Sequence, residues 1–328
     1  MDCDEGAAVK VLAAMSGGVD SAVAAARAHE AGHDVTGVHL ALSRNPASYR
    51  SGARGCCTIE DSNDARRAAD VIGIPFYVWD LSERFHEDVV EDFMDEYAAG
   101  RTPNPCLRCN EKIKFAAVLD RALALGFDAV ATGHYALLRD GDDGLAEMHR
   151  SVDAGKDQSY VLFGMGQEQL AHTLMPVGQY SKESIRAMAT EAGFSNAEKP
   201  DSQDICFIPF GDYKEFIKDR VAAVPGDIVD MEGRVVAQHK GIEFFTVGQR
   251  RGLGLVQTKV DEQPQFVIRL EPEANRVVVG PEEFLYQDSM WASRVNYVLG
   301  QPPAQPVNVA VKTRYKSDDA PAVLHPGK

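Results

Sequence analysis

The stretch Ser16-Gly17-Gly18-Val19-Asp20-Ser21 places two glycines, two hydroxyls and a carboxylate between a short apolar run, 9–14, and an alanine-rich segment, 19–31. Backbone N–H groups of such a turn, together with the dipole of the following helix, bind phosphate groups. Asp20 suits a Mg²⁺ ion that bridges phosphates. The stretch lacks the Gly-Lys-Ser/Thr of a Walker A motif, so it does not imply transfer of a γ-phosphoryl group. The alternative is an ordinary βα turn made of small residues.

Two cysteines lie in a proline-rich segment, 100–110, which is predicted to be a loop before a helix. A thiol near a helix N-terminus, flanked as Cys109 is by Arg108 and Lys112, has a stabilised thiolate, so its pKa should fall. A sulfur nucleophile needs such a thiolate. The Cys106-x-x-Cys109 spacing also allows half a zinc site, part of an iron–sulfur site or a redox dithiol.

Six cysteines in 328 residues are too sparse for a disulfide scaffold. Cys56 and Cys57 are adjacent, which is an awkward geometry for two ligands of one tetrahedral zinc ion. Cys206 is followed by Phe207 and Ile208, so a buried structural thiol explains it as well as a catalytic one does.

Apolar runs that alternate with amphipathic segments predict an α/β fold, a parallel sheet with helices on both faces, over roughly the first two hundred residues. The expected strands are 9–14, 35–42, 75–80 and 128–132, and the expected helices are 19–31, 61–72, 83–99 and 111–125. Beyond residue 208, glycine, proline and short alternating runs predict a small, mostly β domain. We therefore expect domains at 1–208, 209–282 and 283–328, the last with a strand at 307–315.

The charge balance, 34 Lys and Arg against 49 Asp and Glu for a net charge of −15, argues against a nucleic-acid partner unless the RNA site is local. Candidate basic patches are Arg101, Arg108, Lys112 and Lys114; Lys240, Arg250 and Arg251; and Lys312, Arg314 and Lys316. Each patch taken alone also fits solvated surface charge. The chain has neither a run of about 18 apolar residues nor the features of a signal peptide, so we expect a cytoplasmic protein with no membrane partner.

The loop 16–21 resembles the signature of the N-type ATP pyrophosphatase, or PP-loop, superfamily. Ala131-Thr132-Gly133-His134-Tyr135, after the fourth predicted strand, resembles a second nucleotide-contacting element of that superfamily. The resemblance implies an adenine nucleotide α-hydrolase-like fold. It also implies cleavage of ATP between the α- and β-phosphates, with adenylation of a carbonyl oxygen and release of pyrophosphate.

Five motifs occur in order along the chain: the loop 16–21, Pro103-Asn104-Pro105-x-x-x-Cys109-Asn110, Lys156-Asp157-Gln158-Ser159-Tyr160, Asp201-Ser202 with Ile205-Cys206-Phe207-Ile208, and 246–254 (TVGQRRGLG). Together they resemble the bacterial tRNA-specific 2-thiouridylase family over nearly the whole chain. The resemblance implies a sulfurtransferase that uses ATP to replace the C2 oxygen of the wobble uridine in tRNA anticodons with sulfur. Its partners would be tRNA and a protein that donates persulfide sulfur.

The resemblance implies roles for individual residues. Cys109 would be the nucleophile, Cys206 would carry sulfur as a persulfide, and the two would form a transient disulfide. The ATP site would comprise Ala14, Met15, Ser16, Gly17, Gly18, Val19, Asp20, Ser21, Leu40 and Gly133. The tRNA contacts would come from Asn104, Pro105, Cys106, His134, Lys156, Asp157, Gln158, Arg314 and Tyr315.

The implied chemistry is consistent with the residues present. Adenylation makes the C2 oxygen of uracil a good leaving group, and the Cys206 persulfide then attacks C2, directly or as released hydrosulfide. A reductant and a fresh sulfur donor reset the two cysteines. The target base must leave the stack, which costs little in a single-stranded anticodon loop.

Two features depart from the family pattern. Many members carry aspartate where this chain has Cys106, which puts an acid/base role there in doubt and leaves room for an iron–sulfur ligand beside Cys109 and Cys206. The C-terminal β-barrel is expected to be partial, truncated near Lys328. Two other functions stay open: a small-molecule adenylating ligase, which would not need Cys109 and Cys206, and a non-catalytic protein that binds RNA or metal.

Overall fold

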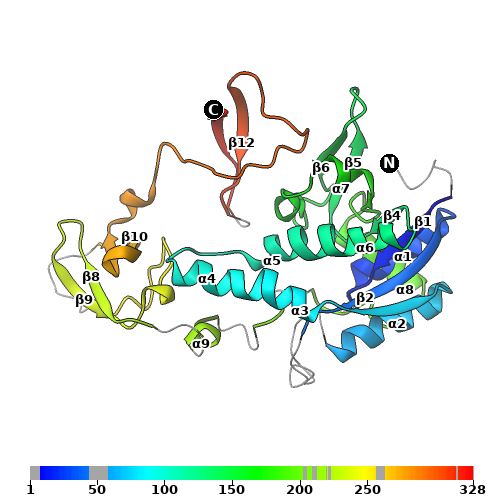
Figure 1. The fold of residues 1–328 in the computed structure, drawn as a ribbon, viewed down its shortest axis with the longest axis horizontal. Coiled ribbons are helices and arrows are strands. Elements are labelled where there is room, and N and C mark those ends of the chain that lie inside the picture. The colour runs from blue at the N-terminus through cyan, green and yellow to red at the C-terminus, as the bar shows by residue number, and fades with distance from the viewer. Residues whose placement is uncertain are drawn as a thin grey trace. The chain divides into compact units, whose positions relative to one another are not determined.

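The computed structural model describes residues 8–43, 58–201, 205–208, 213–218, 220, 223–255, 263–314 and 317–327. Its central sheet has five parallel strands in the order β3-β2-β1-β4-β7, which confirms the predicted parallel sheet (Figure 1). The strands are β1 (Lys10–Ala14), β2 (Asp34–Ala41), β3 (Phe76–Asp80), β4 (Ala129–Ala131) and β7 (Thr173–Leu174).

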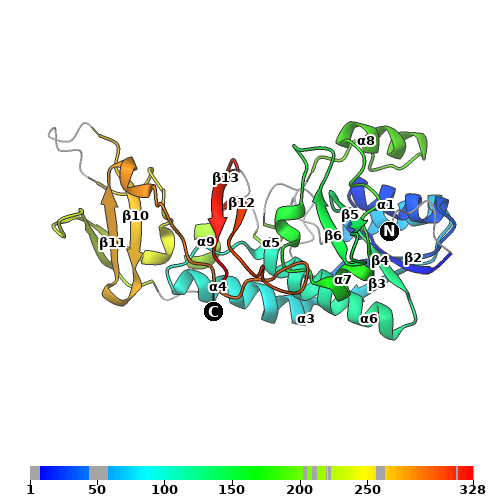
Figure 2. The same ribbon diagram turned by 90° about the horizontal axis from the view of Figure 1, so that it is seen from above.

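Alternate residues of β1 face opposite sides of the sheet, as the period of a strand requires. Val11 and Ala13 pack with α1 (Val19–Glu30), α2 (Ile59–Ile72) and α8 (Lys182–Glu191). Leu12 packs on the other face, against apolar residues of α6 (Val118–Ala124). Figure 2 shows α8 and α6 on opposite sides of the sheet. Helices on both faces explain why the central strands are apolar throughout.

The helix ends follow local chemistry. Helix α1 ends at Glu30, just before Gly32, whose φ of +87° suits the left-handed turn that follows a helix. Helix α2 begins at Ile59, earlier than predicted, because Thr58 and Asp61 form a capping box. The Asp61 amide donates to Thr58 Oγ1 (3.1 Å) and the Thr58 amide donates to Asp61 Oδ2 (3.0 Å).

Two helical runs contain π-helical turns. The first consists of α3 (Ser82–Phe85), η2 (His86–Glu91) and α4 (Asp92–Ala98), and the second of α5 (Pro105–Arg108), η3 (Cys109–Ala117) and α6. The second run begins at Pro105, so the prediction that 100–110 is a loop is wrong for 105–110. Proline fits the first position of a helix, because a backbone N–H there would have no hydrogen-bond partner within the helix.

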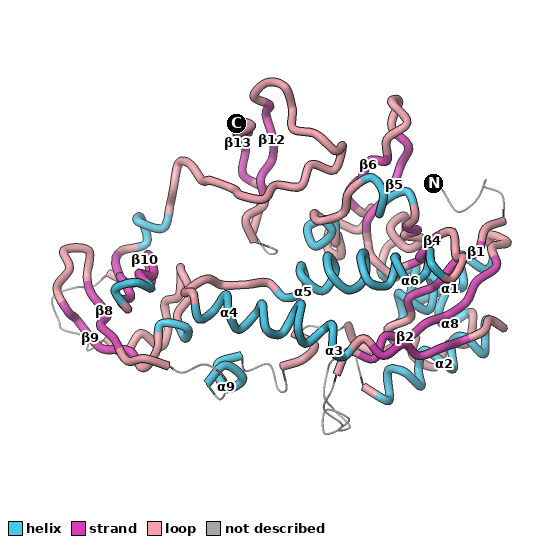
Figure 3. Tube along the Cα trace, in the orientation of Figure 1, coloured by secondary structure: helices cyan, strands magenta, loops and turns pink. Residues whose placement is uncertain are grey.

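The chain packs as two compact units, one formed by 1–88, 106–207 and 295–328, the other by 89–105 and 208–294. The first unit also holds η4 (Ser159–Leu162), α7 (Gln167–Ala171) and the hairpins β5–β6 (Ala136–Asp140, Ala146–Arg150) and β12–β13 (Val307–Val311, Ala320–Leu324), magenta in Figure 3. Strand β12 ends at Val311, short of the predicted 315. In the described residues, no helix is long and apolar enough to cross a lipid bilayer.

The second unit contains a mixed sheet in the order β10-β11-β8-β9. Its further elements are β8 (Gly226–Val229), β9 (Val235–His239), η6 (Ile242–Phe244), β10 (Phe266–Glu271), η7 (Pro272–Ala274), β11 (Arg276–Gly280), η8 (Glu282–Leu285) and the helix α9 (Tyr213–Lys218). Its core includes Ile228, Ile242, Val267 and Val277. The short strands agree with the change in sequence pattern after residue 208.

Candidate active site

The strand order places the loop 16–18 where ligands bind in open parallel sheets. Strand β1 lies between β2 and β4, so the chain leaves β1 toward one edge of the sheet and returns on its other side at β4. The carboxyl ends of strands at such a switch point form a crevice. The predicted nucleotide residues Ala14, Met15 and Leu40 lie at the ends of β1 and β2, and the Met15 amide donates to Val38 O (2.8 Å).

The loop is fixed by its own side chains. Ser21 Oγ accepts a hydrogen bond from the Ser16 amide (3.1 Å) and donates one to Gly18 O (3.0 Å). Gly18 is the N-cap residue of α1 in an extended conformation, so the helix dipole points at the loop. The Ser16 side chain is exposed at this end of the helix. The arrangement could accept an anion at the start of α1, because the positive end of the helix dipole lies there.

Gly17 lies directly against the first turn of α2. Its φ is +81°, and a Cβ atom there would lie 2.7 Å from the carbonyl carbon of Asp61 and nearer still to its oxygen. The Gly17 carbonyl accepts hydrogen bonds from Asn196 Nδ2 (3.0 Å) and Lys199 Nζ (3.1 Å). Lys199 also contacts Asp61 Oδ1 (2.7 Å) and Asp64 Oδ2 (2.6 Å). The loop therefore admits only glycine at this position.

Gly133, after β4, packs directly on the start of α1. A Cβ atom at Gly133 would lie 2.6 Å from the Ser21 amide nitrogen. The next residue, His134, is buried, and its Nδ1 lies 3.0 Å from Thr132 Oγ1. Burial, and then the charge of Lys114, hold the pKa of His134 well below its ordinary value. His134 is thus neutral at pH 7, so a contact with RNA at this residue would not use positive charge.

Asp20 is held by residues from two other parts of the chain. Tyr135 Oη donates to Asp20 Oδ1 (2.7 Å), and Lys182 Nζ donates to both Asp20 oxygens (2.7 and 2.8 Å). Burial, and then the charge of Asp20, raise the pKa of Tyr135, so its hydroxyl remains a donor. Lys182 itself is buried at the first position of α8.

Asp201 lies against the same lysine. Its Oδ1 is 2.7 Å from Lys182 Nζ and its Oδ2 is 2.7 Å from Lys156 Nζ, with Arg186 Nη2 at 3.6 Å. Burial opposes ionisation of Asp201, but the hydrogen bonds from Lys156 and Lys182 outweigh it and lower the pKa of the carboxyl. Asp201 therefore carries its charge at neutral pH.

The side chains of Asp157 and Gln158, predicted to contact tRNA, brace nearby backbone. Asp157 Oδ1 accepts from the Ser151 amide (2.9 Å), and Gln158 Oε1 accepts from the Tyr135 amide (2.9 Å). The segment 156–158 therefore supports the loop after β4. Arg314 is exposed beyond β12, whereas Tyr315 lies outside the described residues.

The cysteine-bearing helix differs from the expectation. Asn104 is half-buried, Pro105 is buried, Cys106 is exposed in α5, and Cys109 is buried at the start of η3. Cys109 thus stands one turn inside the helical run, and the prediction that it precedes the helix is wrong.

The cations beside Cys109 are paired with a common carboxylate. Arg108 Nη1 lies 3.0 Å from Glu111 Oε2, and Lys112 Nζ lies 3.1 Å from Glu111 Oε1. Burial works against ionisation of Glu111, but these hydrogen bonds, Lys112 first, hold its pKa below the ordinary value. Both cations are therefore partly neutralised before they can act on a thiolate at Cys109.

Cys206 is half-buried next to Phe207, whose ring meets Phe85 of α3 edge-on at a centroid distance of 5.8 Å. Helix α3 also packs against η3, the helix that begins with Cys109. The residue after Cys206 and the helix that begins with Cys109 therefore both contact α3. The cysteines that the structure describes, 106, 109 and 206, are not in disulfides. Within the described ranges, no three His, Cys, Asp or Glu side chains form a group that could hold a metal ion.

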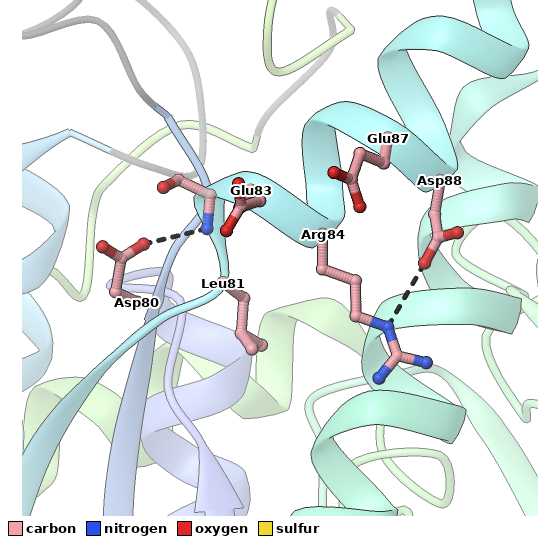
Figure 4. A pocket seen from close by; sticks show the side chains of 7 residues that line it. Asp80, Leu81, Glu83, Arg84, Glu87 and Asp88 are labelled. Atoms are coloured by element: carbon pink, nitrogen blue, oxygen red, sulfur yellow. Dashed lines mark hydrogen bonds and ion pairs between the residues drawn. The ribbon is translucent and has the colours of Figure 1, made fainter.

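An acidic pocket of about 940 Å³ opens where β3 passes into α3 (Figure 4). It is lined by Asp80, Leu81, Ser82, Glu83, Arg84, Glu87 and Asp88. The Ser82 amide donates to Asp80 Oδ1 (2.9 Å) and Arg84 Nε donates to Asp88 Oδ2 (3.2 Å). Because carboxylates outnumber the single guanidinium, this pocket does not suit a polyanion.

Lys182, Asn196 and Lys199 hold the loop from far along the chain, and the sequence pattern did not predict them. Only Lys182 leaves a local signal. It follows Ser181, whose side chain caps α8 by accepting from the Ser184 amide (3.1 Å). A cation in the first turn of a helix is opposed by the helix dipole, so it indicates a carboxylate partner elsewhere.

Comparison with known proteins gives consistent matches. The family described as tRNA methyl transferase HUP domain matches residues 9–210, and the tRNA methyl transferase PRC-barrel domain matches residues 214–281. A tRNA-specific 2-thiouridylase MnmA of Nocardioides sp. is 68% identical over 282 residues, covering 84% of this chain and 77% of the relative. The protein of that name from Salinispora arenicola is 60% identical over 318 residues, covering 97% and 87%.

Among solved structures, a 4-thiouridine synthetase in complex with RNA and ATP has 16% identity and a TM-score of 0.38, covering 64% of this chain and 50% of that one. A likeness this low adds nothing to the assignment, which rests on the sequence matches. They extend across both units and reach 68% identity. The chain belongs to the tRNA-specific 2-thiouridylase (MnmA) family.

Proposed function

We propose that this chain is a tRNA-uridine 2-sulfurtransferase that forms 2-thiouridine at the wobble position of tRNA anticodons. The observation that carries the proposal is that the loop 16–21, fixed by its own hydrogen bonds, lies in the same unit as Cys109 and Cys206. The match to 2-thiouridylases over most of the chain supports it. We keep the domain limits 1–208, 209–282 and 283–328 as part of this proposal.

In the first step, ATP bound at the loop is attacked at its α-phosphorus by the C2 oxygen of uridine, and pyrophosphate leaves. The amides at the start of α1 bind the phosphates. Mg²⁺ usually binds through one or two carboxylates together with substrate phosphates. Asp20 would supply such a carboxylate to a metal that arrives with the nucleotide, in exchange for a hydrogen bond from Lys182. The proposed ATP residues are those at the ends of β1, β2 and β4 and in the loop.

In the second step, the terminal sulfur of a Cys206 persulfide attacks C2, and AMP leaves with the former C2 oxygen. The Cys109 thiolate then attacks Cys206 Sγ, which breaks the persulfide S–S bond, leaves sulfur on C2 and forms the Cys109–Cys206 disulfide. A thiol reductant supplies the two electrons that reopen the disulfide. A protein persulfide reloads Cys206.

The tRNA contacts remain proposals: Asn104, Pro105, Cys106, His134, Lys156, Asp157, Gln158, Arg314 and Tyr315. Of these, Cys106 and Arg314 are the most exposed described side chains. An iron–sulfur cluster on Cys106, Cys109 and Cys206 has no support in the geometry, since the described residues do not assemble such a group. We therefore propose chemistry that uses the cysteines as thiols.

The test separates the two steps. Purified protein receives unmodified tRNA, ATP, Mg²⁺ and a persulfide donor, and we measure pyrophosphate release and 2-thiouridine by mass spectrometry of digested tRNA. We expect Cys109→Ser and Cys206→Ser to release pyrophosphate in the presence of tRNA but to form no 2-thiouridine. Release that needs a small acid or amine instead of tRNA would identify a small-molecule ligase and overturn the proposal.

A further inference from the structure

The loop 246–254 (TVGQRRGLG) has no part in the chemistry proposed above. It lies in the second unit and carries Arg250 and Arg251, whose side chains are both exposed. Within the described part of the chain, neither guanidinium has an ion pair or a hydrogen bond. Two adjacent, unpaired arginines are a local exception in a chain with a net charge of −15.

Three basic patches stand out in the sequence, and the structure separates them. In the first patch, within 101–114, each cation has a partner, and two of them share the carboxylate of Glu111. In the third patch, 312–316, the described cations also have interaction partners. In the second patch, Arg250 and Arg251 have no such partner among the described residues. These two arginines can therefore bind an anion without giving up a carboxylate.

The loop is anchored to the core of its unit at both ends. Phe245 and Leu253 are buried there, on either side of the two arginines. Between them, the Gly248 amide donates to Val267 O (2.8 Å), and the Val267 amide donates to Gln249 O (2.9 Å). The loop is thus attached to β10 immediately before the arginines.

The side chain of Gln249 fixes the backbone of the loop from within. Its Oε1 accepts a hydrogen bond from the Thr246 amide (3.2 Å), and its Nε2 donates one to Arg251 O (2.9 Å). Gly252 follows with a φ of +72°, a left-handed conformation that glycine adopts without strain. Because the backbone is already held, little conformational entropy is lost there when a ligand binds the arginines.

The side chains of the loop suit phosphate groups rather than bases. A guanidinium presents a planar fork of donors that matches two phosphate oxygens, and it stays charged at neutral pH. No residue of 246–254 is aromatic, so the loop offers no ring on which a base could stack. An exposed pair of such cations therefore fits a polymer whose charges repeat along its backbone.

We propose that the loop 246–254 binds the phosphate backbone of tRNA through Arg250 and Arg251. The inference rests on the proposed tRNA substrate and adds a contact made by the second unit. Phosphate contacts fix the position of a nucleic acid but carry no sequence information. The loop therefore helps to hold the tRNA and does not select the target uridine.

The test measures tRNA binding by the full-length protein, by fluorescence anisotropy at several salt concentrations, without ATP or a persulfide donor. The variant is the double substitution Arg250→Gln, Arg251→Gln. Each lost phosphate contact lowers the slope of log Kd against log salt concentration by about 0.7–0.9, so we expect a decrease of about 1.4–1.8. When the salt concentration is lowered about fourfold, the ratio of the variant Kd to the wild-type Kd should therefore grow by about tenfold.

A matched control removes the same charge from the same unit. Arg269 and Arg276 are both bound to Glu271, at 2.9 and 2.7 Å, so the double substitution Arg269→Gln, Arg276→Gln should leave the salt slope near that of wild type. Arg250→Lys, Arg251→Lys keeps both charges and should also keep the slope. A tRNA without a wobble uridine should lose affinity for the glutamine variant to the same extent as one that has it.

The outcomes distinguish this inference from the proposed function. If wild type does not bind tRNA, both fall. If wild type binds tRNA and the glutamine variant has the wild-type slope, or if the control or the lysine variant loses as much of the slope as the glutamine variant does, this inference alone is overturned. Normal tRNA binding with slower loading of sulfur from a protein persulfide would assign the loop to the sulfur donor instead and would equally overturn it.

Discussion

Replacing Gly17 by alanine tests the geometry on which the nucleotide loop depends. Two penalties add at this position: a left-handed backbone and a Cβ atom placed against the backbone of Asp61, with the carbonyl carbon at 2.7 Å. Those atoms belong to the capped first turn of α2 and cannot rotate away as a side-chain end could. Gly32 has a similar φ, +87° against +81°, but nothing lies within 4 Å of its would-be Cβ atom. Gly32→Ala is therefore a matched control.

The two substitutions should differ by the cost of the clash. A left-handed conformation costs alanine about 1–2 kcal/mol, partly offset by a stiffer unfolded chain, so we expect Gly32→Ala to cost about 1 kcal/mol. Overpacking at Gly17 adds about 1–3 kcal/mol, and displacing its carbonyl from Asn196 and Lys199 adds about 1 kcal/mol. The cost of Gly17→Ala should therefore exceed that of Gly32→Ala by about 2–4 kcal/mol. For a unit of this size, that corresponds to roughly 4–16 °C in Tm.

The assay is thermal unfolding with and without ATP and Mg²⁺. A ligand that binds only the folded state raises the midpoint temperature at which the unit containing its site unfolds. The transition that ATP shifts is therefore the unfolding of the nucleotide-binding unit. We expect ATP to stabilise wild type and Gly32→Ala but not Gly17→Ala. Equal midpoints for the two variants, or an ATP shift retained in Gly17→Ala, would refute the close approach of the loop to α2.

Three further predictions concern single charges. Burial lowers the pKa of Lys199, but the hydrogen bonds that it donates to Asp61 and Asp64, with the charges of these carboxylates, raise it overall. The contribution of Lys199 to the free energy of unfolding should therefore be full below its ordinary pKa of 10.5 and be lost as the pH rises through the raised pKa. In urea unfolding at pH 7, Lys199→Met should lower the free energy of unfolding by about 1–2 kcal/mol, which is less than the loss expected for a fully buried ion pair. At strongly alkaline pH, the two proteins should have about the same free energy of unfolding. Burial lowers the pKa of His134. The free energy of unfolding of the wild type should therefore fall as the pH drops below 6.5, by at most about 1.4 kcal/mol per pH unit from this residue. His134→Gln should lack this part of the pH dependence, and an equal pH dependence in the two proteins would contradict a buried neutral imidazole. Asp20→Ala should stop tRNA-dependent pyrophosphate release while Cys206 still accepts sulfur, as measured by the intact mass of the persulfide; release at the wild-type rate would remove Asp20 from the adenylation site.

The sequence was sufficient for the sheet and for the loop because both depend on short-range patterns. The apolar strands and the glycine-rich turn of residues 16–21 are readable within about fifteen residues, and the structure places them as predicted. The start of the cysteine-bearing helix was not predicted, since its prolines favour a loop as much as a helix start. Pro105 in fact occupies the first helical position.

The residues that hold the loop could not be predicted from local pattern. Lys182 reaches Asp20 across 162 positions of the chain, and Lys199 reaches Gly17 across 182. Such pairs depend on how α8 packs on α1, which no local window contains. The partial neutralisation of Arg108 by Glu111 was missed for a different reason. An i, i+3 pair brings side chains together only in a helix, and this stretch was expected to be a loop.

The π-helical turns of η3 make the orientation of Cys109 depend on a residue count. In a π-helix each backbone hydrogen bond spans five residues instead of four, so η3 accommodates one more residue per turn than a regular α-helix would. Deleting one exposed residue between Cys109 and α6 would favour α-helical hydrogen bonds, with a rotation of about 100° per residue, and would change the angle at which Cys109 projects relative to α6. Cys109 would then face another direction although no residue of the site had changed in kind. The length and the hydrogen-bond pattern of this helix thus together determine the direction in which Cys109 projects.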